Sequence, residues 1–203
     1  MKEKTVKMVI KSLKEGGVGV LPTDTLYGLV GRAEDKKAVA KIKKLKQRSA
    51  GKPFIILISS LKDLEKFRVK LNKDEKKILE KFWPGPVSVA LSPKLSFRWP
   101  KNKILVEIIK KTGPLVAPSA NPEGLTPAST ITEAKKYFPV KSQGSHGASE
   151  EIDFIISAGK RLSGQPSTLI SLKNGQVEII RQGRARLSPL TLERLFKGSA
   201  AKK

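Results

Sequence analysis

The chain has 203 residues, of which 38% are hydrophobic and 29% are charged, a composition typical of one globular domain with a polar surface. It contains no cysteine, which excludes disulfides, thiol chemistry and cysteine-ligated zinc. Its 41 lysine and arginine residues against 18 acidic ones give a formal net charge of +23, which favours polyanionic partners such as RNA or nucleotide phosphates, although a solubilising lysine-rich surface explains the same excess.

The first predicted helix covers Thr5–Lys14, where apolar residues recur at helical spacing between lysines. These lysines interrupt any signal-peptide core, and no apolar run in the chain reaches the ~18–20 residues of a membrane span. We therefore expect a cytoplasmic protein that contacts no membrane. The next segment, Val18–Leu21, predicts a buried strand that ends at Pro22. The polar turn Thr23–Thr25 follows it, at the end of a strand where open α/β sheets bind their ligands.

Helices and strands alternate along much of the remaining chain. Asn72 with Glu75 and Thr130 with Glu133 have the spacing of capping boxes, which predicts that helices start there. The continuous apolar run Phe54–Ile58 predicts a central strand buried on both faces. The predicted helices are Asp35–Lys46, Leu61–Phe67, Asn72–Phe82, Asn102–Thr112, Thr130–Phe138 and Leu187–Phe196. The further predicted strands are Val87–Leu91, Leu115–Ala117, Asp153–Ile156, Ser167–Leu172 and Gln176–Ile180, the last two forming a hairpin.

Two segments are predicted as loops: Ser92–Pro100, which holds Arg98, and Lys141–Glu151, which holds the only histidine, His146. We assign no catalytic role to a single histidine in a polar loop. Alternating elements followed by a late hairpin predict an α/β fold whose open sheet has mixed strand directions and is flanked by helices. Without an internal repeat or a shift in composition, we expect one domain over residues 1–203, with its core at about 5–196 and a frayed basic tail at 197–203.

A set of polar side chains lies just beyond the ends of predicted strands and helices. Each has an ordinary explanation, since cations at a helix C-terminus, such as Lys46 and Arg48, are common and usually at least partly exposed. Together they would line one cleft suited to a phosphate-bearing ligand. The helix that starts beside Ser129 would add free N–H groups for an anion. The set comprises Thr23, Thr25, Lys46, Arg48, Lys52, Arg98, Ser119, Asn121, Ser129, Ser167 and Arg181.

Several familiar motifs are missing: the sequence has no G-x-S-x-G, H-E-x-x-H, Walker A or G-x-G-x-x-G pattern. Five blocks in order, between about Gly16 and Arg184, instead resemble the signature of the YrdC-like threonylcarbamoyl-AMP synthases, which are also called L-threonylcarbamoyladenylate synthases. These blocks are P-T-D-T-L-Y-G-L at Pro22–Leu29, K-Q-R at Lys46–Arg48 with K-P-F at Lys52–Phe54, W-P-G-P at Trp83–Pro86, P-S-A-N at Pro118–Asn121, and Ser167-Thr168 with Arg181.

The resemblance implies a YrdC/RibB-like fold: an open, twisted α/β sheet with a basic concave face. It also implies a nucleotidyltransferase that makes threonylcarbamoyl-AMP and pyrophosphate from L-threonine, bicarbonate and ATP. The adenylate serves the threonylcarbamoyladenosine modification of tRNA, and other proteins of that pathway transfer the group. Because a carbamate oxygen attacks the α-phosphorus, cations and the Mg²⁺ that accompanies ATP would lower the barrier. Neither a protein nucleophile, nor an organic cofactor, nor a metal site built from the protein alone is expected.

The resemblance also assigns the site residues. The catalytic set would be Lys46, Arg48, Ser119 and Asn121, with the two cations holding the triphosphate. Ser129 and Arg181 would add ATP contacts, and Thr23, Lys52, Arg98 and Ser167 would bind threonine, whose carboxylate suits arginine. The chain departs from the family pattern at Ser49, where proline is usual, and in the short stretch between Pro86 and Arg98. We expect no counterpart of the extra C-terminal domain of longer relatives.

Two alternatives stay open at this point. A non-catalytic module that binds tRNA or double-stranded RNA, or associates with the ribosome, would explain the net charge on the same fold. Against it, a surface that binds an RNA backbone does not require the specific pair Ser119 and Asn121. A synthase of a riboflavin precursor would require clustered acidic metal ligands, and the sequence has none near Thr23 or Ser119.

Overall fold

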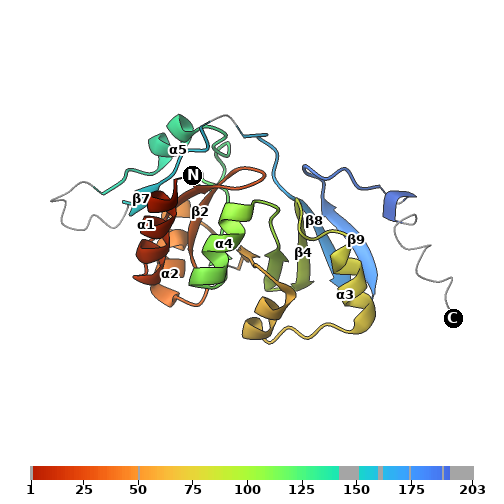
Figure 1. Ribbon diagram of the computed structural model, residues 1–203. Coiled ribbons are helices and arrows are strands. Elements are labelled where there is room, and N and C mark those ends of the chain that lie inside the picture. Colours follow the sequence, from red (N-terminus) through yellow and green to blue (C-terminus); the bar gives the residue numbers. More distant parts are fainter. Residues whose placement is uncertain are drawn as a thin grey trace.

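The computed structural model describes residues 2–49, 51–141, 151–159, 162–173, 175–188 and 190–192. Within these ranges the strands form one open sheet in the order β7-β1-β2-β6-β3-β5-β4-β8-β9 (Figure 1). The pairs β1–β7, β3–β5 and β4–β8 are parallel and the other neighbours antiparallel, so the predicted mixed sheet is confirmed. The strands are β1 (Gly19–Pro22), β2 (Tyr27–Arg32), β3 (Ile55–Leu57), β4 (Val87–Ser92), β5 (Leu95–Arg98), β6 (Leu115–Val116), β7 (Phe154–Ile155), β8 (Thr168–Lys173) and β9 (Gln176–Arg181).

Four helices begin at predicted side-chain caps, whereas the first helix begins at Glu3, two residues before its predicted start, and has no side-chain cap. Asp35 accepts hydrogen bonds from the N–H groups of Lys37 and Ala38, and Asn102 accepts one from Leu105 at 3.1 Å. The capping boxes at Asn72 and Thr130 are both formed. No helix within the described ranges is long and apolar enough to cross a bilayer. The helices are α1 (Glu3–Lys14), α2 (Lys36–Lys46), the 3₁₀ helix η1 (Leu61–Phe67), α3 (Lys73–Glu80), α4 (Lys103–Thr112) and α5 (Ile131–Tyr137).

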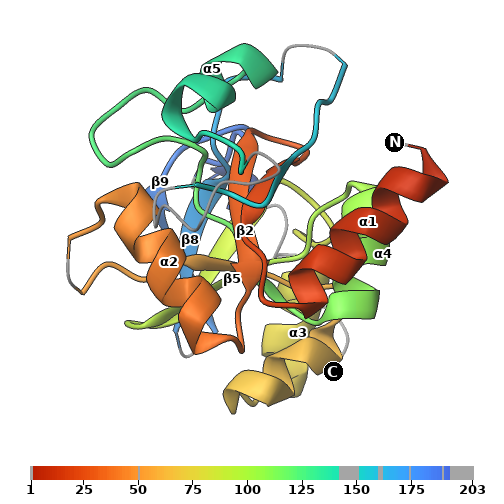
Figure 2. The same cartoon turned by 90° about the vertical axis from the view of Figure 1, so that its left-hand side faces the viewer.

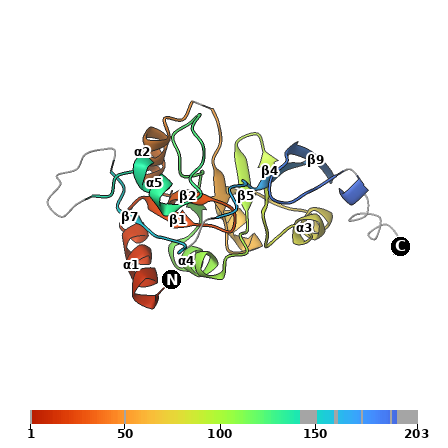
Figure 3. The same ribbon diagram turned by 90° about the horizontal axis from the view of Figure 1, so that it is seen from above.

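Helices cover both faces of the sheet, which creates two apolar cores (Figures 2 and 3). On one face α1 packs against α4, and on the other lie α2 and α5. Successive strand residues serve the two cores in turn: Val20 joins the core under α2, and Leu21 joins the core under α1 and α4. The same double burial explains why the segment around β3, Phe54–Ile58, is a continuous apolar run.

Two strands depart from the sequence-based expectation. The predicted loop Ser92–Pro100 contains β5, whose backbone pairs with β3 on one side and β4 on the other. Its sequence, L-S-F-R, has a weak local strand preference, so long-range pairing decides its structure. Strand β2 was not predicted because two glycines interrupt it. One of them, Gly31, lets α2 approach, since an added Cβ there would lie 3.0 Å from Ile42 Cδ1.

The N–H groups beside Ser129, which were predicted to be free for an anion at the start of α5, are bonded within the protein. Glu133 Oε2 already accepts hydrogen bonds from the N–H groups of Ser129 and Thr130, at 2.7 and 3.2 Å, and from the Ser129 hydroxyl. The carboxylate of Glu133, which completes the capping box at Thr130, therefore occupies these donors as well. Most of the predicted loop Lys141–Glu151, with His146, and most of the predicted helix Leu187–Phe196 lie outside the described residues, as does the tail at 197–203.

Candidate functional site

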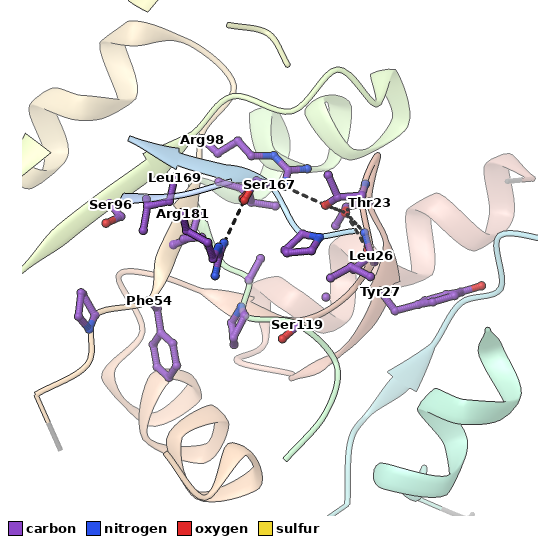
Figure 4. A pocket seen from close by; sticks show the side chains of 18 of the residues that line it. Thr23, Leu26, Tyr27, Phe54, Ser96, Arg98, Ser119, Ser167, Leu169 and Arg181 are labelled. Atoms are coloured by element: carbon purple, nitrogen blue, oxygen red, sulfur yellow. Dashed lines mark hydrogen bonds between the residues drawn. The ribbon is translucent and has the colours of Figure 1, made fainter. Parts of the chain in front are cut away.

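A cavity of about 290 Å³ opens where the β1–β2 turn, the segment after α2, the end of β6 and the start of β8 meet (Figure 4). These segments are far apart in sequence, but the topology of the sheet brings them together. Thr25 lines the cavity, and of the ten site residues that the family resemblance assigns, three do not: Lys46, Asn121 and Ser129. The seven that do are Thr23, Arg48, Lys52, Arg98, Ser119, Ser167 and Arg181.

The hydroxyl of Thr23 holds the β1–β2 turn together. It accepts hydrogen bonds from the N–H groups of Thr25 and Leu26, at 3.1 and 3.2 Å, and donates to the Leu26 carbonyl at 2.7 Å. Thr25 Oγ1 also lies 3.0 Å from this hydroxyl, so the one proton and two lone pairs of Thr23 find all their partners within the turn. In this arrangement Thr23 shapes the cavity wall, and Thr25 Oγ1 accepts a bond from Arg98 Nη1 at 3.0 Å.

Arg98 enters the cavity from β5, and this buried side chain is held by an ion pair with the partly buried Asp24. Its Nη2 donates to Asp24 Oδ1, and its side chain is only 5% exposed. Burial lowers the pKa of Arg98, and the adjacent carboxylate opposes that shift. The Nε of Arg98 is buried without a hydrogen-bond partner. Asp24 also lines a second hollow, of about 690 Å³, between this turn and α4, so the ion pair spans the wall that separates the two cavities.

Asp24 was not among the predicted site residues. Its position between two predicted site threonines was the available signal, but an aspartate in a turn is ordinary. The partner that makes it part of the site is 74 residues away in the chain. Asp24 therefore belongs to the site because of a tertiary contact.

Lys46 connects the two segments of the candidate catalytic set, K-x-R after α2 and S-x-N after β6. Its ammonium donates to the Ser119 carbonyl at 2.8 Å, to the Asn121 carbonyl, and to Asn121 Oδ1 at 3.2 Å. The expectation that Lys46 is partly exposed is wrong, because it is 2% exposed and lies one helical turn after buried Ile42. Burial, with a smaller effect from Arg48, lowers the pKa of Lys46 to about 8.

The loop that contains Ser119 and Asn121 is fixed from both sides. The Asn121 amide donates to the carbonyls of Pro122 and Leu125, at 2.8 and 2.7 Å, while its oxygen faces Lys46. Ser119 forms a backbone bridge with Gly28 in β2 and presents its side chain to the cavity. Asn121 therefore holds the loop in shape, and Ser119 is the member of the pair that faces the cavity.

Four cationic side chains line the cavity, and two of them are opposed by carboxylates: Arg98 by Asp24, and Lys52 by Glu123. The hydrogen bonds that the structure gives the other two go to neutral carbonyls. Arg48 donates to Lys52 and Pro53, and Arg181 donates to Ser167 at 3.0 Å. The described part of the site thus carries an excess of positive charge, which suits an anionic ligand.

A serine and an aromatic ring complete the lining, and each contacts a further side chain. The hydroxyl of Ser167 lies 2.8 Å from that of Ser88, which is buried behind the lining and was not predicted as a site residue. The Arg48 guanidinium stacks over the ring of Phe54, 5.0 Å from its centroid, which holds the cation in place. Among the described residues there is no group of three or more histidine, aspartate or glutamate side chains that could hold a metal ion.

Comparison with known proteins identifies relatives of this chain. The profile of the Sua5/YciO/YrdC family, described as "Telomere recombination", matches residues 11–183. A protein of Methanocaldococcus jannaschii that is provisionally named a threonylcarbamoyl-AMP synthase is 30% identical over 193 residues, covering 90% of this chain and 87% of its own length. The threonylcarbamoyl-AMP synthase of Cellvibrio japonicus is 29% identical over 188 residues, covering 85% and 93%.

A solved structure shares the fold. The crystal structure of Pyrococcus abyssi Sua5 complexed with L-threonine superposes with a TM-score of 0.82 at 26% identity. The match covers 96% of this chain and 58% of the Sua5 chain, so the chain spans little more than half the length of that protein. The similarity extends over the whole sheet rather than over isolated motifs.

Proposed function

The chain belongs to the Sua5/YciO/YrdC family, and from that membership we propose that it is a threonylcarbamoyl-AMP synthase. It would convert L-threonine, bicarbonate and ATP into L-threonylcarbamoyladenylate and pyrophosphate, as a nucleotidyltransferase. The observation that supports this proposal is the cationic cavity. Arg48 of the K-x-R segment and Ser119 of the S-x-N segment line it, and Lys46 bonds the two segments to each other. The relatives are named as synthases, which favours this enzymatic activity over the alternative of a non-catalytic RNA-binding module.

The reaction determines what such a site must do. Threonine's amine and bicarbonate form a carbamate with loss of water, and one carbamate oxygen attacks the α-phosphorus of ATP. The bond between the α-phosphorus and the bridging oxygen breaks, and pyrophosphate leaves with that oxygen. Two anions must approach each other, so positive charge and fixed geometry supply most of the rate enhancement.

We propose that Arg48 and Arg181 bind phosphate groups, because in the described part of the site their hydrogen bonds go to carbonyls and neither forms an ion pair with a carboxylate. Lys46 would act on the nucleotide mainly through the Ser119 loop, since its ammonium is buried against that loop. Thr23, Lys52, Arg98 and Ser167 would form the threonine side of the cavity, as their positions in its lining allow. Asn121 and Ser129 would then shape the nucleotide site from outside the lining.

Mg²⁺ is proposed to enter with ATP, because this ion binds phosphates readily and keeps several waters. tRNA, or double-stranded RNA, and other proteins of the threonylcarbamoyladenosine pathway are proposed partners. The net charge of +23 supports contact with RNA. A cytoplasmic location is proposed because ATP and tRNA are available there.

Release of pyrophosphate tests the proposal directly. The purified protein with Mg²⁺, ATP and bicarbonate should release pyrophosphate only when L-threonine is added. Serine should support less release, because it lacks the methyl group of threonine. A coupled phosphate assay and mass spectrometry of the adenylate would measure both products. The absence of threonine-dependent release would refute the proposed function.

The lowered pKa of Lys46 predicts a pH dependence of nucleotide binding. As the pH rises through about 8, Lys46 loses its proton in the folded protein, so the site loses one positive charge and binds Mg·ATP more weakly. Calorimetric titrations between pH 7.5 and 9.5 would measure this decline, because the arginines stay protonated and ATP keeps its charge over that range. A Lys46→Met variant should show no decline. Equal slopes in the two proteins would contradict the assignment.

A further inference from the structure

Glu123 makes a contact that the proposed mechanism does not use. Its Oε2 accepts hydrogen bonds from the Ser49 N–H at 2.7 Å and the Ser49 hydroxyl at 3.2 Å, and its Oε1 accepts one from the Lys52 ammonium. The backbone N–H of Glu123 donates to the Lys46 carbonyl at 2.8 Å. A carboxylate thus lies against the segment that connects the K-x-R pair to Lys52.

The negative charge of Glu123 changes the pKa values of two cationic residues of the site. Its bonds to Lys52 and Ser49 lower the pKa of Glu123 to about 2, so it is ionised at any pH at which the protein works. The same charge raises the pKa of both Lys46 and Arg48 against the effect of their burial. Glu123 is therefore the acidic group that balances this cationic segment.

Lys52 lines the cavity while its ammonium is bound to Glu123. The ammonium, backbone N–H and hydroxyl that bind the Glu123 carboxylate are donors that would bind the oxyanion of a substrate in the same way. We propose that Glu123 competes with a substrate oxyanion for Lys52, and that binding of that substrate displaces the Glu123 side chain. The inference rests on the proposed function only for the source of the oxyanion, which is the triphosphate of ATP or the carboxylate of threonine.

The surroundings of Glu123 allow such a displacement. Its side chain is 25% exposed. The next residue, Gly124, has a φ of +86°, and nothing lies within 4 Å of where its Cβ would be, while Leu125 is half exposed. The side chain can therefore turn towards solvent without breaking apolar packing. Asn121 would meanwhile keep the rest of the loop in place through Lys46.

The test is to titrate the full-length protein with Mg·ATP and, separately, with L-threonine by calorimetry. The variants are Glu123→Gln, which removes the charge, and Glu123→Asp, which keeps the charge on a shorter side chain. If the carboxylate holds Lys52 about nine-tenths of the time, Glu123→Gln should bind the displacing substrate about tenfold more tightly, and Glu123→Asp should show a smaller gain. The matched control, Glu107→Gln on α4, breaks an exposed pair with Lys111 and should leave both affinities unchanged.

The outcomes separate this inference from the proposed function. A gain for Mg·ATP alone identifies phosphate as the competitor, and a gain for threonine alone identifies the carboxylate. If the wild-type protein binds both substrates and Glu123→Gln binds neither more tightly, the inference is overturned and the proposed function stands. An equal gain in Glu107→Gln also overturns it, because net charge would then explain the effect. If neither the wild type nor Glu123→Gln binds either substrate, both proposals fail.

Discussion

Lys46→Met is expected to reduce threonine-dependent pyrophosphate release by about 100-fold in kcat/KM, the effect of misplacing a catalytic group by about an ångström. The ammonium of Lys46 holds the Ser119–Asn121 loop through three oxygen atoms, and methionine provides no donor for them. The free energy of unfolding should also fall by about 1–3 kcal/mol, because buried carbonyls lose their partner. Steady-state kinetics and urea denaturation measure the two effects.

Arg48→Met is the matched control, since it removes a cation two residues away. Arg48 is only partly buried, and its guanidinium bonds to two carbonyls on the exposed side of the loop. This variant should weaken Mg·ATP binding while its unfolding free energy changes by less than about 1 kcal/mol. If Lys46→Met were as stable as the wild type and equally active, Lys46 would not hold the Ser119 loop.

Asp24→Asn is expected to lower the free energy of unfolding by about 3 kcal/mol, because it leaves the buried Arg98 charge without a carboxylate partner. The KM for threonine should rise more than kcat falls, since the freed guanidinium no longer holds its place in the cavity wall. Equilibrium denaturation and threonine saturation curves would measure the two changes.

A double-mutant cycle with Arg98→Met tests the cause. The double variant, Asp24→Asn with Arg98→Met, should be more stable than the sum of the single effects predicts, because it contains neither buried charge. Strictly additive losses would show that Asp24 and Arg98 do not stabilise each other. A double variant that regains stability but not threonine binding would fit a direct role of Arg98 in holding the substrate.

Much of the helical structure could be predicted from local sequence. The caps at Asp35, Asn72 and Thr130 bond to N–H groups two or three residues away, so a short segment contains all the information needed. Strand β5 could not be found in this way, because its hydrogen bonds go to β3 and β4. A strand with polar residues shows its character only when its neighbours are known.

The same distinction applies to the site. The order of the polar blocks along the chain was enough to suggest one cationic cleft and the residues near it. That order does not show which polar atoms are already bonded within the protein. For this reason Lys46 was predicted to be partly exposed, and the N–H groups beside Ser129 were predicted to be free. Neither Asp24 nor Glu123 stood out, since acidic residues in turns and loops are common.

By itself, then, the amino-acid sequence determined the α/β class, the helices with local caps, the excess of positive charge and most of the polar side chains that line the cavity. The tertiary structure alone decided which of those side chains face the cavity and which hold its walls. The physical reason is that a hydrogen bond or ion pair depends on distances of about 3 Å. Between residues more than 70 positions apart, such as Lys46 and Ser119 or Asp24 and Arg98, only the folded chain sets those distances.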